Sequence, residues 1–125
     1  MKMITVKLNG AEVQAALLSP KVMEKVEKGF TKAVLEIEAI ARTDEGLESE
    51  QVRKQCQVII DYVTDIFGAD AARKIFSGET DYLTCLDVLE EMQRMYPEQV
   101  GPVIRAKNAQ IKANVERANA KGAAK

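Results

Sequence analysis

Apolar and polar side chains alternate along residues 4–15, on either side of an Asn-Gly pair. The apolar positions recur at every second residue from Ile4 to Leu8 and again from Ala11 to Ala15. Asn-Gly between two such runs predicts a β-hairpin with a type I′ turn, because both central residues of that turn take positive φ. A two-residue loop sets the register, so Val6 is expected to face Val13 with the apolar side chains of both strands on one face.

From residue 20 onward the apolar spacing changes to three or four residues, which predicts helices. Ser19-Pro20 predicts the first helix start, since Ser caps helices and Pro is tolerated at the first helical position. A loop is expected at residues 43–46. Ser49, Asp70 and Asp81 are expected to cap three further helices, and Pro97 is expected to end the last of them. We therefore predict an α+β fold, mostly α, with an N-terminal hairpin followed by four or five helices.

Charge divides the chain into a body, residues 1–100, and a tail, residues 101–125. The body carries 12 Lys and Arg against 18 Asp and Glu, a net charge of −6, while the tail carries six basic residues and one acid, a net charge of +5. The tail is helix-prone but thinly apolar, and we expect it to be helical to about residue 115 and frayed beyond. The opposite charges predict a separate role for the tail or its attraction to an acidic surface.

The composition argues against an enzyme. The chain has no His, the commonest general base and metal ligand. Cys56 and Cys85 lie on apolar helical faces, and without His to activate them we expect buried thiols. Asp61 and Asp65 share a helical face, but no further ligand lies at helical spacing, so we expect solvated carboxylates. No catalytic residue, cofactor or metal site is predicted.

The apolar runs in the sequence indicate where the protein is located and whether it enters a membrane. Residues 1–9 lack the apolar stretch and the cleavage site of a signal peptide. The longest apolar runs are much shorter than a membrane span. We therefore expect a cytoplasmic protein that does not enter a membrane.

Partner contacts are the remaining lead. Methionine fills cores and also lines adaptable binding surfaces, and both interpretations stay open for the methionines near the end of the last body helix. The tail adds a thin apolar stripe that needs a surface to dock on. The candidate residues for binding a partner protein are Met92, Met95, Tyr96, Ile104, Ile111 and Val115.

The stretch from residue 65 to residue 89 resembles a known family. A helix ends in Phe67-Gly68, a short helix ends in Ile75-Phe76-Ser77-Gly78, and Cys85 stands in the first turn of the next helix. With the Asn-Gly hairpin, these segments resemble the tail assembly chaperones of long-tailed, siphovirus-type phages and prophages of Gram-positive bacteria. The resemblance covers roughly residues 1–100, its specific part is residues 61–95, and Asp70 stands where that family has Gly.

The shared segments look structural. The two glycines, Gly68 and Gly78, permit left-handed helix caps, because glycine adopts positive φ without steric cost. Phe67, Ile75 and Phe76 are expected to wedge between helices.

The resemblance implies a concrete function. Such chaperones bind the long, helical tape-measure protein in the host cytoplasm and keep it soluble until the tail-tube protein displaces them. They are absent from the mature virion. Two alternatives stay open: a small nucleic-acid-binding regulator that uses the basic tail, and a virion structural or head–tail joining protein.

Nucleic acid is the less favoured partner. Arg105, Lys107 and Lys112 can contact phosphates. The tail has no aromatic residue to stack on bases, however, and the body is acidic.

We also predict a homo-oligomer. A two-stranded sheet leaves unpaired edges that invite another chain, and the tail of one copy complements the charge of the next. The residues expected at contacts between copies are Ile4, Val6, Val13, Arg105 and Lys112. The alternative is a monomer whose tail folds back on its own body.

Overall fold

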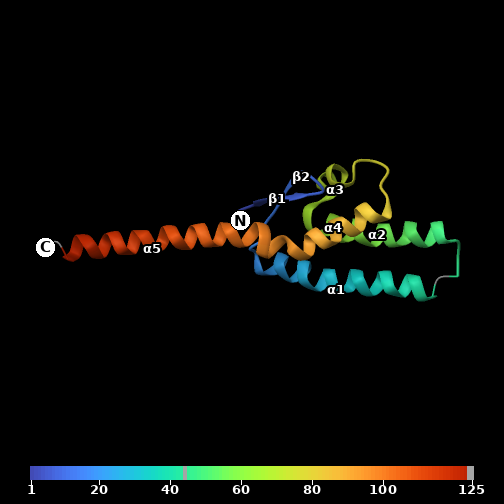
Figure 1. The fold of residues 1–125 in the computed structure, drawn as a ribbon, viewed down its shortest axis with the longest axis horizontal. Coiled ribbons are helices and arrows are strands. Elements are labelled where there is room, and N and C mark those ends of the chain that lie inside the picture. Colours follow the sequence, from blue (N-terminus) through green and yellow to red (C-terminus); the bar gives the residue numbers. More distant parts are fainter. Residues whose placement is uncertain (44, 124–125) are drawn as a thin grey trace.

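The chain folds into a small body from which one long helix projects (Figure 1). The computed structural model describes residues 1–43 and 45–123; Asp44 of the predicted loop and the last two residues of the predicted tail lie outside this range. The elements in order are β1 (Ile4–Leu8), β2 (Ala11–Ala15), α1 (Pro20–Thr43), α2 (Glu48–Phe67), α3 (Ala69–Phe76), α4 (Tyr82–Met95), the π-helical turn η1 (Tyr96–Val100) and α5 (Gly101–Ala123). The predicted α+β fold, mostly α, is confirmed.

The hairpin has the predicted register. Val6 pairs with Val13, and Asn9 and Gly10 take the positive φ values of 50° and 77° that the turn requires. The apolar face of the hairpin packs on α2, α3 and α4, whereas its polar face is exposed. The side chains of Ile4, Val6 and Val13 are therefore buried in the core, which corrects their predicted place at contacts between copies.

The outer edge of β1 is covered at Lys7, and the turn is covered at Asn9, so the prediction of open edges is wrong for this part of the hairpin. The Lys7 backbone N–H donates to Gln99 Oε1 at 2.7 Å, and Gln99 Nε2 donates to the Lys7 carbonyl at 2.9 Å. The Asn9 backbone N–H donates to the Glu91 carboxylate at 2.9 Å. Side chains from α4 and η1 thus take the place that a third strand would have along part of β1.

Helices α1 and α2 pack side by side and approach closely at Gly29. A Cβ built on Gly29 would lie 2.7 Å from Cε1 of Tyr62, so the ring occupies the space that any larger residue needs. The Tyr62 hydroxyl donates to the Val26 carbonyl at 2.7 Å, which fixes the ring against α1. The glycine therefore sets how closely the two helices pack.

The starts of four helices show which predicted caps form. α1 begins at Pro20 as predicted, and α4 is capped by Asp81, whose carboxylate accepts from the Thr84 N–H at 2.8 Å. Two predicted caps are wrong: α2 begins after Leu47 rather than at Ser49, and α3 begins after Gly68. Asp70 instead lies inside the first turn of α3, where the partial positive charge of a helix N-terminus favours a carboxylate.

α4 ends at Met95, just before Pro97, but the helical path does not stop there, which corrects a further prediction. The chain continues through η1 into α5, and α5 stays helical to Ala123 rather than to about residue 115. Pro97 stands in the first turn of η1, where a missing backbone N–H is tolerated. Within η1 the Gly101 N–H donates to the Tyr96 carbonyl, the i to i+5 pattern of a widened turn.

Replacing Gly29 by Ala should destabilise the protein although Ala is the better helix former. The new methyl group must displace the Tyr62 ring, and overpacking of this kind lowers the free energy of unfolding by about 1–3 kcal/mol. Urea unfolding of the full chain measures the change. Gly122→Ala is the matched control, because a Cβ built on Gly122 has no other atom within 4 Å. A Gly29→Ala protein that gains the propensity benefit of about 1 kcal/mol would contradict the close approach.

Candidate protein-binding surface

An apolar groove lies where the N-terminal segment of the chain passes the start of α5. Its volume is about 540 Å³, and residues 2–4, Leu18 and the first turns of α5 line it. Met3 and Val103 in this lining are about half exposed, at 56% and 48%. No Asp or Glu is among the lining residues, which do include Lys2 and Lys107. The groove therefore combines apolar surface with positive charge.

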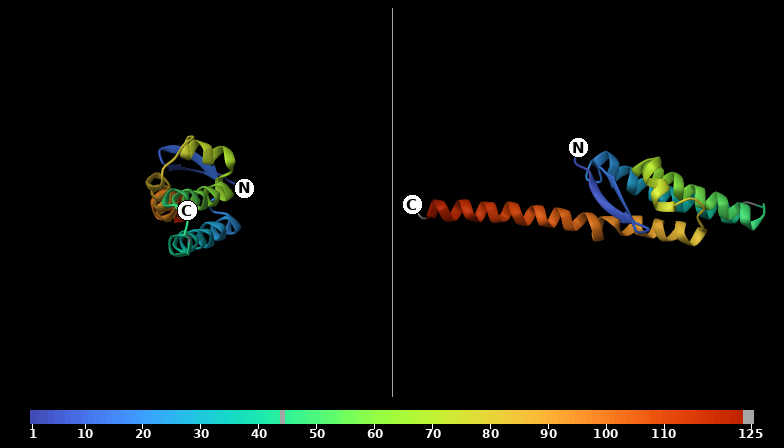
Figure 2. Two further views of the ribbon diagram at one scale, coloured as in Figure 1. Left: turned by 90° about the vertical axis from the view of Figure 1, so that its right-hand side faces the viewer. Right: turned by 90° about the horizontal axis from the view of Figure 1, so that it is seen from above.

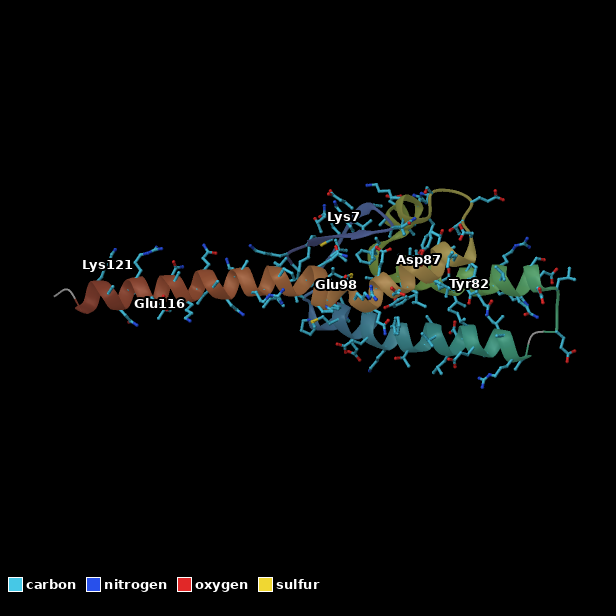
Figure 3. All side chains as sticks on the ribbon, viewed as in Figure 1. Lys7, Tyr82, Asp87, Glu98, Glu116 and Lys121 are labelled. Atoms are coloured by element: carbon cyan, nitrogen blue, oxygen red, sulfur yellow. The ribbon has the colours of Figure 1, made fainter. Side chains whose placement is uncertain are left out.

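The exposed surface continues outward along α5. Every residue from Pro102 to Gly122 is exposed, and the right-hand view in Figure 2 shows the helix standing clear of the body. In the outer half of α5 the side chains, including the labelled Glu116 and Lys121, have no other element beside them (Figure 3). Ile111 and Val115 remain 52% and 53% exposed, so this helix presents apolar side chains to water.

One face of α5 follows a heptad spacing, in which successive positions are four and three residues apart. We call this face the α5 stripe; its residues are Ile104, Asn108, Ile111, Val115, Ala118 and Gly122. The positions that border it, here called the α5 flanks, are Arg105, Lys107, Lys112, Asn114, Asn119 and Lys121. Four of the flank residues are cationic and none is acidic.

The heptad was not among the features predicted from the sequence, although its spacing is visible there. Met3 and Leu18 were not predicted either, because their place in the groove depends on how the hairpin lies against α5. No local pattern in the sequence indicates that contact.

The six predicted partner-binding residues differ in how exposed they are in the structure. Ile104, Ile111 and Val115 are exposed on the α5 stripe. Met92 and Met95 are only 1% and 0% exposed, so they fill the core. The prediction that they bind a partner protein is therefore wrong. Tyr96 is half-buried, and its hydroxyl donates to the Leu17 carbonyl at 2.8 Å.

The predicted contacts between copies divide in the same way. Arg105 and Lys112 are exposed on the α5 flanks, whereas the hairpin residues are buried. α5 points away from its own body (Figure 1), so the tail does not fold back as the monomeric alternative required.

The segments that carry the family resemblance lie around α3. Gly68 and Gly78 have φ values of 93° and 82°, but the left-handed cap of α3 is Ser77. Ile75 and Phe76 are buried, and the half-buried Phe67 packs against the same core. These side chains hold α3 between the hairpin and α2.

The two cysteines and the two α2 aspartates considered as reactive or metal-binding residues have structural surroundings. Cys56 and Cys85 are both free and buried. Burial, and then the neighbouring Cys56 thiol, raises the pKa of Cys85 to about 12, so the thiolate is scarce at neutral pH. Asp65 lies 3.8 Å from Lys25, and Asp61 accepts a hydrogen bond from Gln57.

Residues 1–43 and 45–123 contain no group of three or more His, Cys, Asp or Glu side chains that could hold a metal ion. Over the same residues, no helix combines the length and the apolar character that crossing a membrane requires.

Comparison with known proteins gives a family but no function. Residues 9–122 match the model of a family described as a family of unknown function (DUF6673). The match runs from the hairpin turn to Gly122, so α5 is part of the domain that defines this family. No curated protein and no solved structure matches the chain.

Removing residues 106–125 should leave the body as stable as before. Residues 106–122 are exposed, so we expect the free energy of unfolding to change by less than about 0.5 kcal/mol. Urea unfolding followed by tyrosine fluorescence tests this, since all three Tyr lie in the body. A loss of several kcal/mol would mean that α5 packs on the body in solution.

Alkaline pH should destabilise the protein partly through Cys85. The folded state holds the thiol proton up to a pKa of about 12, whereas an ordinary thiol loses it near 9.0. The folded state therefore binds more protons above pH 9, and the free energy of unfolding falls as the pH rises, by up to about 1.4 kcal/mol per pH unit for one group.

Urea titrations from pH 8 to pH 11 measure this slope. Cys85→Ala should flatten it, while Val88→Ala, which also truncates a buried side chain of α4, should lower stability and keep the slope. If the free energy of unfolding falls with pH equally steeply in both variants, Cys85 is excluded as the source of this pH dependence.

Proposed function

The chain belongs to the DUF6673 family of unknown function, and we propose that it is a non-enzymatic tail assembly chaperone of a siphovirus-type phage or prophage. In this role it binds the tape-measure protein in the host cytoplasm and keeps it soluble until the tail-tube protein replaces it. It then stays out of the mature virion. The observation that carries the proposal is the apolar groove at the base of α5, which continues into the exposed α5 stripe.

A tape-measure protein presents the kind of surface that this groove suits. It is a long helix whose apolar stripes need cover before the tail tube surrounds them. A helix laid in an apolar groove is a common mode of peptide recognition. Each Ile or Val side chain that becomes fully buried contributes about 1.5–3 kcal/mol, and a flexible side chain such as Met3 adapts to varied partners.

A long client also favours many copies of a small chaperone. One groove covers only a few helical turns, so we propose that several copies bind side by side along one tape-measure protein. Copies held close together on one client reinforce each other, because each new contact forms at high effective concentration. Weak individual contacts then suffice, and the tail-tube protein can displace the copies one at a time.

The sequence resemblance is the second support. Residues 61–95 carry the segments shared with tail assembly chaperones, and these form the turns around α3. They pack against β2 and α2, and the hairpin that they support begins at Ile4, one of the residues that line the groove.

Co-expression with the tape-measure protein of the same phage or prophage tests the proposal. We expect the full chain to move the tape-measure protein from the pellet into the supernatant. Met3→Asp with Leu18→Asp should abolish this effect, because both side chains line the groove. Leu83→Asp is the matched control: Leu83 is an exposed leucine on α4 that does not line the groove.

Three results would contradict the proposal. The first is a tape-measure protein whose solubility does not depend on the chain. The second is detection of the chain in purified virions by mass spectrometry, which would favour a virion structural or head–tail joining protein. The third is tight DNA binding that falls steeply with salt, which would favour a nucleic-acid-binding regulator.

A further inference from the structure

We infer that the α5 stripe is a docking surface for one helix of another protein, whose own apolar stripe is flanked by Asp and Glu. The inference rests on the proposed function and deepens it, because it names the chemistry of the client segment. It concerns the α5 stripe and the α5 flanks, most of which lie beyond the groove.

The first step is the spacing of the stripe. Positions separated by four and three residues form a straight seam along a helix, and such a seam is the geometry of helix pairing. From Ile104 to Val115 it extends over about 16 Å of helix. Ile104 and Asn108 also line the groove, so a partner helix on the stripe continues into the groove without a break.

The second step is the charge of the α5 flanks. In paired helices the residues beside the seam contact the partner and select it by charge. Here they include Arg105, Lys107 and Lys112, and the one acid of α5, Glu116, lies outside the flanks. A partner with acidic flanks gains charge pairs along both sides of the seam.

The third step concerns pairing between two copies of α5. A parallel pair places Lys107 of one copy beside Lys112 of the other, and an antiparallel pair brings each basic flank against its own equivalent. Both arrangements juxtapose like charges, so the flanks disfavour pairing of two α5 helices and favour a different, acidic helix.

The fourth step is Asn108, a polar residue between Ile104 and Ile111 in the seam. A polar group in a helix seam is costly unless it meets a polar partner, and it thereby fixes the register of the pair. The partner helix is therefore expected to carry a polar residue in its own apolar stripe.

Two synthetic peptides test the inference with the full chain. Both have apolar seam positions with one Asn and differ only in the flanks, which are Glu in one and Lys in the other. Fluorescence anisotropy of labelled peptides should show at least about tenfold tighter binding of the Glu peptide, a difference of about 1.4 kcal/mol. The difference should narrow in 0.5 M NaCl, because salt screens exposed charges.

Variants of α5 identify the residues responsible. Lys107→Glu with Lys112→Glu leaves two basic and two acidic residues on the α5 flanks and should abolish the preference for the Glu peptide. Ile111→Asn with Val115→Asn should weaken Glu-peptide binding at least about tenfold. Ala109→Asn with Ala113→Asn, on the other side of α5, is the matched control and should bind normally; circular dichroism checks that all variants keep α5 helical.

Three outcomes would overturn the inference: equal binding of the two peptides, binding of neither, or a dimer in sedimentation that Ile111→Asn with Val115→Asn abolishes, since the stripe would then hold a second copy.

Failure of this inference is distinguishable from failure of the proposed function. A tape-measure protein kept soluble by the Ile111→Asn, Val115→Asn variant overturns the inference alone. A clear Glu-peptide preference in a chain that leaves the tape-measure protein insoluble overturns the chaperone proposal alone.

Discussion

A two-stranded hairpin is marginal in water, and its dependence on the helices organises the rest of this structure. Its apolar face needs cover, and α2, α3 and α4 supply that cover. The free edge of β1 needs hydrogen-bond partners for its backbone, and the Gln99 side-chain amide supplies both a donor and an acceptor to Lys7. Because Gln99 belongs to η1, the attachment also fixes the start of α5 relative to the N-terminal segment. The groove exists because these two parts of the chain are held together.

The local parts of this arrangement could be predicted from the sequence. Alternation around Asn9-Gly10 predicts the register of every hairpin pair, because turn length and strand period leave no other solution. Asp81 caps α4 because the Thr84 N–H lies within reach of its side chain. In each case the deciding contacts lie within a few residues of one another.

The predictions that were wrong concern features that depend on contacts between residues distant in the sequence. Helical periodicity places Met92 and Met95 on an apolar face, but it does not say whether another element covers that face. Pro97 is an ordinary stop signal, and it was overridden by a widened turn whose Gln99 side chain bonds to Lys7, 92 residues away along the chain. The groove likewise joins residues 2–4 to α5, and no local pattern indicates this contact.

The widened turn η1 has a geometric consequence for the direction in which α5 faces the surroundings. A π-helical turn is equivalent to one extra residue inserted into an α-helix, and one residue corresponds to a rotation of about 100°. Every side chain of the 23-residue α5 is rotated together by that insertion, without any change in the core that α4 packs into. The angular phase of the projecting helix is thus set at η1, which Gln99 attaches to β1, and not by the packing of α4. A single inserted or deleted residue at this junction would re-aim the whole helix.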